Sequence, residues 1–147
     1  MKVEVQIDSS LDEPVIVLRA PGPGGEVEAL AEKLRVLALP KPFTVYMERE
    51  PVRVGRGAVL RFFSEDKGVF CQTDKNVYTV RQRLYELEEE LDGTRFVRVS
   101  NSEIVNLDRV TALDLTLTGT IKMTLAGGTV CWVSRRYVKK IKQALDL

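Results

Sequence analysis

A run of basic residues near the C-terminus is the clearest candidate for chemistry in the sequence. Residues 134–142 hold five positive charges, and no acidic residue follows until Asp146. Arg135 and Arg136 stand at the start of a predicted helix, where the helix dipole disfavours cations by about 0.3–1 kcal/mol. An anionic partner that contacts both the arginines and the N–H groups of the first turn would offset that cost. The alternative is a solvated helix face whose arginine stems pack over apolar neighbours.

A second candidate is a cluster of small polar side chains over 100–106. Ser100, Asn101 and Ser102 follow a strand-like run. An asparagine amide can bond a base edge, and a serine hydroxyl or a capping N–H can hold a phosphate. A serine with glutamate three residues later is typical of a capping box, which predicts a single helical turn over 104–107. In the plainer interpretation, Ser100 or Ser102 only caps this turn and Asn106 ties it through its amide.

The third candidate is Lys67, in a predicted hairpin turn over 64–68. Its ammonium group could contact a phosphate. However, two acidic residues, Glu65 and Asp66, directly precede it, so charge makes this a weak contact. Without further context, a lysine in a turn is typical of an ordinary surface.

The composition argues against most enzyme chemistry. The chain has 147 residues, of which 29% are charged and none is histidine. Histidine-based catalysis and the common zinc sites are therefore excluded, and no nucleotide-binding or nucleophile motif occurs. We predict a protein that is not an enzyme, with no catalytic residues, no metal and no cofactor. The net charge of +1 gives no overall argument for nucleic acid, so that argument depends on where the charges lie.

Two further features indicate where the protein works. Cys71 and Cys131 have no CxxC spacing and are expected as buried strand residues in a reducing compartment. No apolar run reaches the ~20 residues of a membrane helix, and the N-terminus lacks the apolar block of a signal peptide. We therefore expect a cytoplasmic protein.

The elements that must position the candidates are mostly strands. Apolar residues at helical spacing predict helices over 26–39, 83–91 and 134–145. The strands follow one another closely, which favours antiparallel meanders over βαβ crossovers, so the predicted fold class is mostly β. The predicted strands are 2–7, 15–18, 43–47, 52–54, 59–63, 68–73, 76–80, 96–99, 110–117, 120–125 and 129–133.

The second candidate lies within a longer pattern, Phe96-Val97-Arg98-Val99-Ser100-x-Ser102-x-Ile104-Val105-Asn106-Leu107. This pattern resembles the F-x-R-[VI]-[HS]-x-S-x-[IL]-V-N signature of the LytTR family of bacterial DNA-binding domains. The resemblance extends to Gly127-Gly128-Thr129-Val130 and to a terminal stretch over 133–141, which is similar to the family's S-R-x-x-[LV]-K. It covers about residues 52–145, with three motifs in the family's order.

The resemblance implies LytTR-like antiparallel β-sheets with short helices. It also implies that loops, rather than a helix-turn-helix, reach into successive major grooves of DNA and the minor groove between them. Carried over by position, the DNA-binding residues would be Lys67, Ser100, Asn101, Ser102, Arg135, Arg136 and Lys139.

We expect two parts, a small N-terminal α+β extension over 1–48 and a LytTR-type DNA-binding domain over 49–147. The extension is too short for the receiver domain of roughly 120 residues that many family members carry. We expect it to pack on the β domain or to form a homodimer. The resemblance also implies a small membrane regulatory protein as a partner.

The predicted function is a sequence-specific transcriptional regulator that binds double-stranded DNA at promoter sites. The alternative is a protein–protein interaction module that retains the β framework and engages protein, through the acidic helix 83–91. A single positive stripe that joins Lys67, Arg98 and Arg135/Arg136 would favour DNA over protein as the partner.

Overall fold

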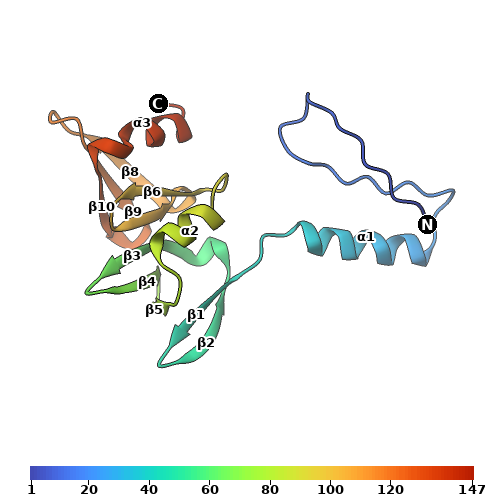
Figure 1. The fold of residues 1–147 in the computed structure, drawn as a ribbon, viewed down its shortest axis with the longest axis horizontal. Helices are drawn as coiled ribbons and strands as arrows, with labels where there is room; N and C mark the ends of the chain where they lie inside the picture. Colours follow the sequence, from blue (N-terminus) through green and yellow to red (C-terminus); the bar gives the residue numbers. More distant parts are fainter. The chain divides into compact units, whose positions relative to one another are not determined.

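The computed structural model describes all 147 residues, which form two compact units, Met1–Pro40 and Lys41–Leu147 (Figure 1). The boundary expected from the sequence, between residues 48 and 49, falls between two paired strands, β1 (Phe43–Met47) and β2 (Glu50–Val54). Because β1 also pairs with a later strand of the sheet, its residues belong with the larger unit.

The larger unit contains an antiparallel seven-stranded sheet. Its strand order is β2-β1-β5-β4-β3-β7-β6, and helix α2 (Leu84–Glu90) connects β5 to β6. The strands beyond the first hairpin are β3 (Val59–Glu65), β4 (Gly68–Thr73), β5 (Val77–Val80), β6 (Phe96–Ser100) and β7 (Glu103–Asn106). The mostly β prediction is confirmed, with each predicted strand from residue 43 onward present.

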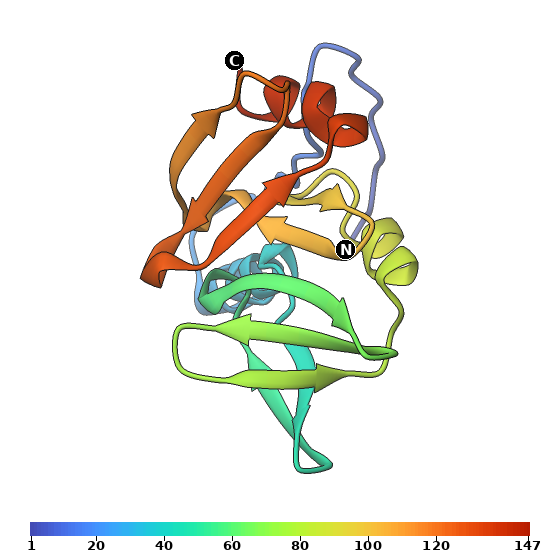
Figure 2. The same cartoon turned by 90° about the vertical axis from the view of Figure 1, so that its left-hand side faces the viewer.

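A second, three-stranded sheet precedes the C-terminal helix (Figure 2). Its order is β10-β9-β8, with β8 (Val110–Leu115), β9 (Ile121–Leu125) and β10 (Val130–Val133). Helix α3 (Arg135–Ala144) follows β10 directly. Short 3-10 turns lie at Arg56–Ala58, Leu107–Arg109 and Ala126–Gly128. No helix of the structure has the length and apolar character that a bilayer span requires.

Two hydrophobic clusters hold the larger unit together. In the first cluster, α2 packs on the large sheet around three phenylalanine rings. The Phe43 ring meets the rings of Phe62 and Phe96 edge-on, with 5.0 and 5.4 Å between the ring centroids. The second packs the small sheet and Ile141 of α3 on the other side of β6 and β7. Because successive side chains of a strand face opposite ways, β6 and β7 supply apolar residues to both clusters.

The helical turn predicted over 104–107 is wrong, because Ile104, Val105 and Asn106 lie in β7. The two β-branched side chains are buried in different clusters, so this segment needs the two-sided geometry of a central strand. The Ser-x-x-Glu pattern has another role here, because Ser100 pairs with Glu103 across a hairpin turn.

The smaller unit, Met1–Pro40, contains one regular element, helix α1 (Gly25–Ala38), as predicted. The strands predicted over 2–7 and 15–18 are not formed, although a turn does separate these segments, in which Leu11 N–H donates to the Asp8 carbonyl at 3.3 Å. Hydrogen bonds from Ser10 lower the pKa of the Asp8 carboxyl. A lone two-stranded ribbon is marginal in water, and no residue of this unit is buried.

Candidate nucleic-acid interface

The turn between β3 and β4 presents Lys67. Asp66 and Lys67 both have positive φ, 46° and 67°, as the central residues of a type I′ hairpin turn require. Glu65 and Gly68 pair directly on either side of them. The lysine is exposed, and its left-handed backbone costs roughly 1–2 kcal/mol relative to a helical or extended one. The turn therefore holds a cation at the outermost point of the hairpin.

The turn between β6 and β7 presents Asn101. Ser102 N–H donates to the Ser100 hydroxyl at 3.2 Å, and the two hydroxyls lie 3.3 Å apart. The Asn101 side chain is exposed and makes no hydrogen bond within the chain. The serine hydroxyls thus shape a β-hairpin turn instead of capping the helical turn that the plainer interpretation expected, whereas the asparagine amide is open to a partner.

Arg98 stabilises this turn by hydrogen bonds to its backbone, a role that the sequence did not predict. Its guanidinium donates to the carbonyl oxygens of Ser100 and Asn101, at 2.6 and 2.7 Å. The Glu88 carboxylate of α2 lies 3.8 Å from the same group, and the arginine side chain is only 12% exposed. Arg98 is therefore engaged inside the domain and does not contribute to an exposed positive stripe. Its place in the F-x-R motif was the signal that could have revealed this role.

The start of α3 presents Arg135 and Arg136. Ser134 precedes the helix but makes no side-chain cap; its N–H donates to the Val99 carbonyl at 2.9 Å. Both arginines are exposed, and Arg136 lies 5.6 Å from the centre of the Tyr137 ring. None of the helix's cations forms an ion pair: Arg135, Arg136, Lys139, Lys140 and Lys142. The helix thus carries a positive face without internal compensation.

Backbone contacts bring the three segments together. Ser64 N–H, beside the Lys67 turn, donates to the Ser102 carbonyl at 2.9 Å, so the first two turns are neighbours. The bond from Ser134 to Val99 places the start of α3 beside the end of β6, next to Ser100. In Figure 2 the green β3–β4 turn, the yellow β6–β7 turn and the red start of α3 lie toward the same, right-hand side. Three segments distant in sequence therefore share one end of the domain.

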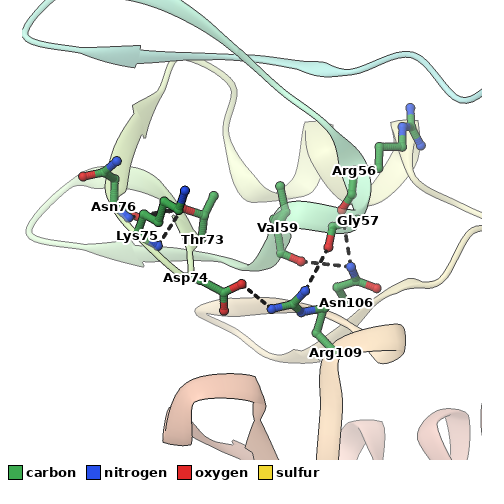
Figure 3. Close-up of polar contacts among 9 residues, drawn as sticks. All are labelled: Arg56, Gly57, Val59, Thr73, Asp74, Lys75, Asn76, Asn106 and Arg109. Atoms are coloured by element: carbon green, nitrogen blue, oxygen red, sulfur yellow. Dashed lines mark hydrogen bonds and ion pairs between the residues drawn. The ribbon is translucent and has the colours of Figure 1, made fainter.

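Asn106 lies at the opposite end of β7 and has a structural role (Figure 3). It is 2% exposed, and its amide nitrogen donates to the Val59 carbonyl at 2.9 Å. Its amide oxygen accepts from Asp108 N–H at 3.1 Å. Close by, Arg109 bonds the Gly57 carbonyl and pairs with the Asp74 carboxylate. The interpretation of Asn106 as a turn-tying residue is thus correct.

Glu103, next to the β6–β7 turn, belongs to a polar network that joins the two sheets. Its carboxylate pairs with Arg61 at 2.7 Å, and both side chains are less than one-fifth exposed. Arg61 also donates to Gln72, whose amide donates to the Thr129 hydroxyl beside β10 at 2.9 Å. This network links β3 and β4 of the large sheet to Thr129, directly before β10 of the small sheet.

Both cysteines of the chain are buried. Burial raises the pKa of the Cys71 thiol to about 12. The pKa of the Cys131 thiol is also raised to about 12, mainly by burial and secondly by the nearby Glu103 carboxylate. Both thiols are therefore protonated and unreactive at neutral pH. No group of three or more acidic or cysteine side chains is placed to hold a metal ion.

The structure is thus a mostly antiparallel β domain in which two adjoining turns and the start of α3 carry polar and basic groups. The family model of the LytTr DNA-binding domain matches residues 52–146, and the chain belongs to this family. The function of the chain is accordingly that of a DNA-binding transcriptional regulator, and the alternative of a protein-interaction module is not favoured.

Relatives and a solved structure agree with the family. An uncharacterized HTH-type transcriptional regulator of Staphylococcus aureus strain NCTC 8325 / PS 47 is 31% identical over 147 residues, which is 100% of this chain and 99% of the relative. The counterpart in strain MRSA252 is 30% identical over the same length. The LytTr DNA-binding domain of a DNA response regulator from Bacillus cereus superposes with a TM-score of 0.69 at 21% identity, over 74% of this chain and 100% of that domain.

A helix-turn-helix label in the names of these relatives does not describe the fold seen here. That motif needs two helices joined by a turn of three or four residues. In this chain α2 and α3 are separated by five strands, β6 to β10.

Proposed function

We propose that residues 41–147 lie along one face of duplex DNA and contact it with three adjoining segments. Lys67 contacts DNA from the β3–β4 turn, Asn101 reads base edges from the β6–β7 turn, and Arg136 reads base edges from α3. Ser100, Ser102, Arg135 and Lys139 lie beside these residues and contact the phosphates. The observation that carries this proposal is the pair of backbone bonds, Ser64 to Ser102 and Ser134 to Val99, that joins the three segments.

The charge distribution supports different roles for these residues, with some contacting phosphates and others contacting base edges. The unpaired cations of α3 favour phosphate contacts, which give affinity that falls with salt but carry little sequence information. The exposed Asn101 amide can both donate to and accept from a base edge, and an arginine can bond guanine through two N–H groups. Affinity would thus come mainly from α3, and specificity from Asn101 and Arg136.

The experiment begins by selecting bound fragments from random or genomic DNA with the purified full-length chain. Asn101→Ala and Arg136→Ala are then compared with wild type on the selected site by fluorescence anisotropy. Each should weaken binding by about tenfold or more, because one good base contact contributes ~1–3 kcal/mol of discrimination. The melting temperature should stay within about 1–2 °C, because both side chains are exposed.

Lys75→Ala is the matched control, because Lys75 is an exposed cation in the β4–β5 loop, at the other end of the sheet. It should leave the Kd within about twofold of wild type. If both test variants bind the site as tightly as wild type, these contacts are not the ones that read DNA. A Kd that does not rise with salt would also contradict the proposal.

Three finer expectations accompany this proposal and stay predictions: action as a homodimer, a cytoplasmic location, and restraint by a small membrane protein.

A further inference from the structure

Four polar side chains form the inter-sheet chain, which runs from the β6–β7 turn to the small sheet: Glu103, Arg61, Gln72 and Thr129. Glu103 is the first residue of β7, two positions after Asn101. Its Oε2 accepts from Arg61 Nη1 at 2.7 Å, and Arg61 Nε donates to Gln72 Oε1 at 2.7 Å. Gln72 Nε2 donates to the Thr129 hydroxyl at 2.9 Å. The inter-sheet chain therefore connects a turn of the large sheet to the residue directly before β10.

The bonds of the inter-sheet chain are directional and largely removed from water. The side chains of Arg61 and Glu103 are 19% and 17% exposed, and the Arg61 guanidinium lies 4.2 Å from the centre of the Phe63 ring. An ion pair of this kind adds little net stability relative to apolar side chains of similar volume, because desolvation offsets the attraction. Its hydrogen bonds do require defined distances and angles, which apolar packing does not. The inter-sheet chain is therefore better suited to fixing a geometry than to raising stability.

Strand β10 is bonded to the large sheet at both of its ends. Ser134 N–H, directly after the strand, donates to the Val99 carbonyl of β6 at 2.9 Å. The bond from Gln72 to Thr129 attaches the other end to β4. A strand attached at one end can pivot about that point, whereas a strand attached at both ends has a fixed direction. Because β10 leads directly into α3, its direction determines where Arg136 lies (Figure 2).

We propose that the inter-sheet chain consists of positioning residues, which fix the spacing between Asn101 and Arg136 so that both side chains reach base edges of one DNA site. Its residues act through Asn101 and Arg136 rather than by touching DNA. This inference rests on the proposed DNA interface, because the spacing matters only where both residues read bases. A binding constellation needs placement within about 0.5 Å, whereas phosphate contacts carry no sequence information. Breaking the inter-sheet chain should therefore weaken specific binding and spare non-specific binding.

The first test is Thr129→Val, which removes the last bond of the inter-sheet chain and keeps the branched side-chain shape. The matched control is Thr124→Val in β9 of the same sheet, where the hydroxyl makes no hydrogen bond within the chain. Thr129→Val should raise the Kd for the selected site by about threefold to tenfold. It should leave the Kd for unrelated DNA within about twofold, because phosphate contacts dominate non-specific binding. The control should bind both DNAs like wild type, and equal effects of the two variants would contradict the proposal.

Combining Thr129→Val with Arg136→Ala separates positioning from stability. If Thr129 acts through Arg136, then Thr129→Val should weaken site binding by less than about twofold in the Arg136→Ala background, because the contact that it positions is already absent. Its effect on the melting temperature should be the same in both backgrounds, because Arg136 is exposed. Losses of site affinity that add fully would overturn the proposal.

A measurement without DNA tests the geometry itself. Nitroxide labels on the variant Asn101→Cys/Arg136→Cys report the distance between the two positions by double electron–electron resonance. The native cysteines are buried and stay unlabelled. In this labelled background, Gln72→Leu and Thr129→Val should each shift or broaden the distance distribution, and Thr124→Val should not.

An unchanged distance distribution in both Gln72→Leu and Thr129→Val would overturn the proposal, whatever the DNA measurements give. A changed distribution, together with unimpaired DNA binding by Asn101→Ala and Arg136→Ala, would support the spacing role and refute the proposed DNA contacts. Failure of this inference is therefore distinguishable from failure of the proposed function.

Discussion

Both units of this chain contain segments of alternating apolar residues, but only the larger unit buries those residues. In Lys41–Leu147, alternating apolar strands pair in two sheets, and residues such as Val59, Phe62 and Ile121 are at most 1% exposed. In Met1–Pro40, an equally alternating segment leaves Val3, Val5 and Ile7 at least 84% exposed. Alternation of apolar and polar residues therefore specifies a strand only where neighbouring strands and a covering layer exist. The larger unit supplies both, whereas residues 2–7 of the smaller unit join no strand ladder.

The largest expected difference between the units is in side-chain truncation. Phe62→Ala should lower the free energy of unfolding by about 3–5 kcal/mol, because it removes the centre of the aromatic cluster of the first core. Leu37→Ala, in α1, should change the stability of the larger unit by less than about 0.5 kcal/mol, because Leu37 is 76% exposed. Urea unfolding followed by fluorescence of Trp132, the one tryptophan, measures both. Equal losses of unfolding free energy in the two variants would mean that the two units unfold together, which would contradict the contrast drawn between them.

A smaller effect should separate the two asparagines of the signature motif. Asn106→Ala should cost about 2–4 kcal/mol, because it leaves the buried Val59 carbonyl and Asp108 N–H without partners. Asn101→Ala should change stability by less than about 0.5 kcal/mol, because its amide is exposed and bonds nothing within the chain. The same urea titration tests both variants. A large loss for Asn101→Ala would place that side chain in the framework and remove the argument for its reading DNA.

The smallest expected effect concerns alkaline pH and again belongs to the larger unit, which holds both cysteines. Folding raises the pKa of each thiol from its ordinary value near 9.0 to about 12. Below pH 9 both states keep the proton, so the full stability is present. Between about pH 9 and 12 only the unfolded chain loses it, so stability falls by about 1 kcal/mol per thiol at pH 10.

The measurement is urea unfolding at pH 8 and pH 10, in wild type and in Cys71→Ala/Cys131→Ala. The double variant should lose most of the difference between the two pH values. If the difference is unchanged in the double variant, lysines or tyrosines cause it rather than the thiols.

Residue periodicity was enough to predict most of the framework. Strands such as β4 and helices such as α1 and α3 lie within a residue or two of their predicted limits, because they are bounded by turn residues and have strong local patterns. The error over 104–107 arose where local and tertiary signals conflict. A capping pattern favoured a helix there, but burial of β7 between two cores imposed a strand.

The sequence by itself determined the fold class, the family and which three segments carry polar and basic groups, since each of these depends on residue type and short-range spacing. Only the tertiary structure decided that these segments adjoin, because that depends on β3 pairing with β7 and on α3 packing against β6, between residues more than 30 positions apart. It also decided that Arg98 and Asn106 support the framework while Asn101 stays open. Hydrogen-bond partners depend on where the backbone carbonyls lie after folding, and no local pattern encodes those positions.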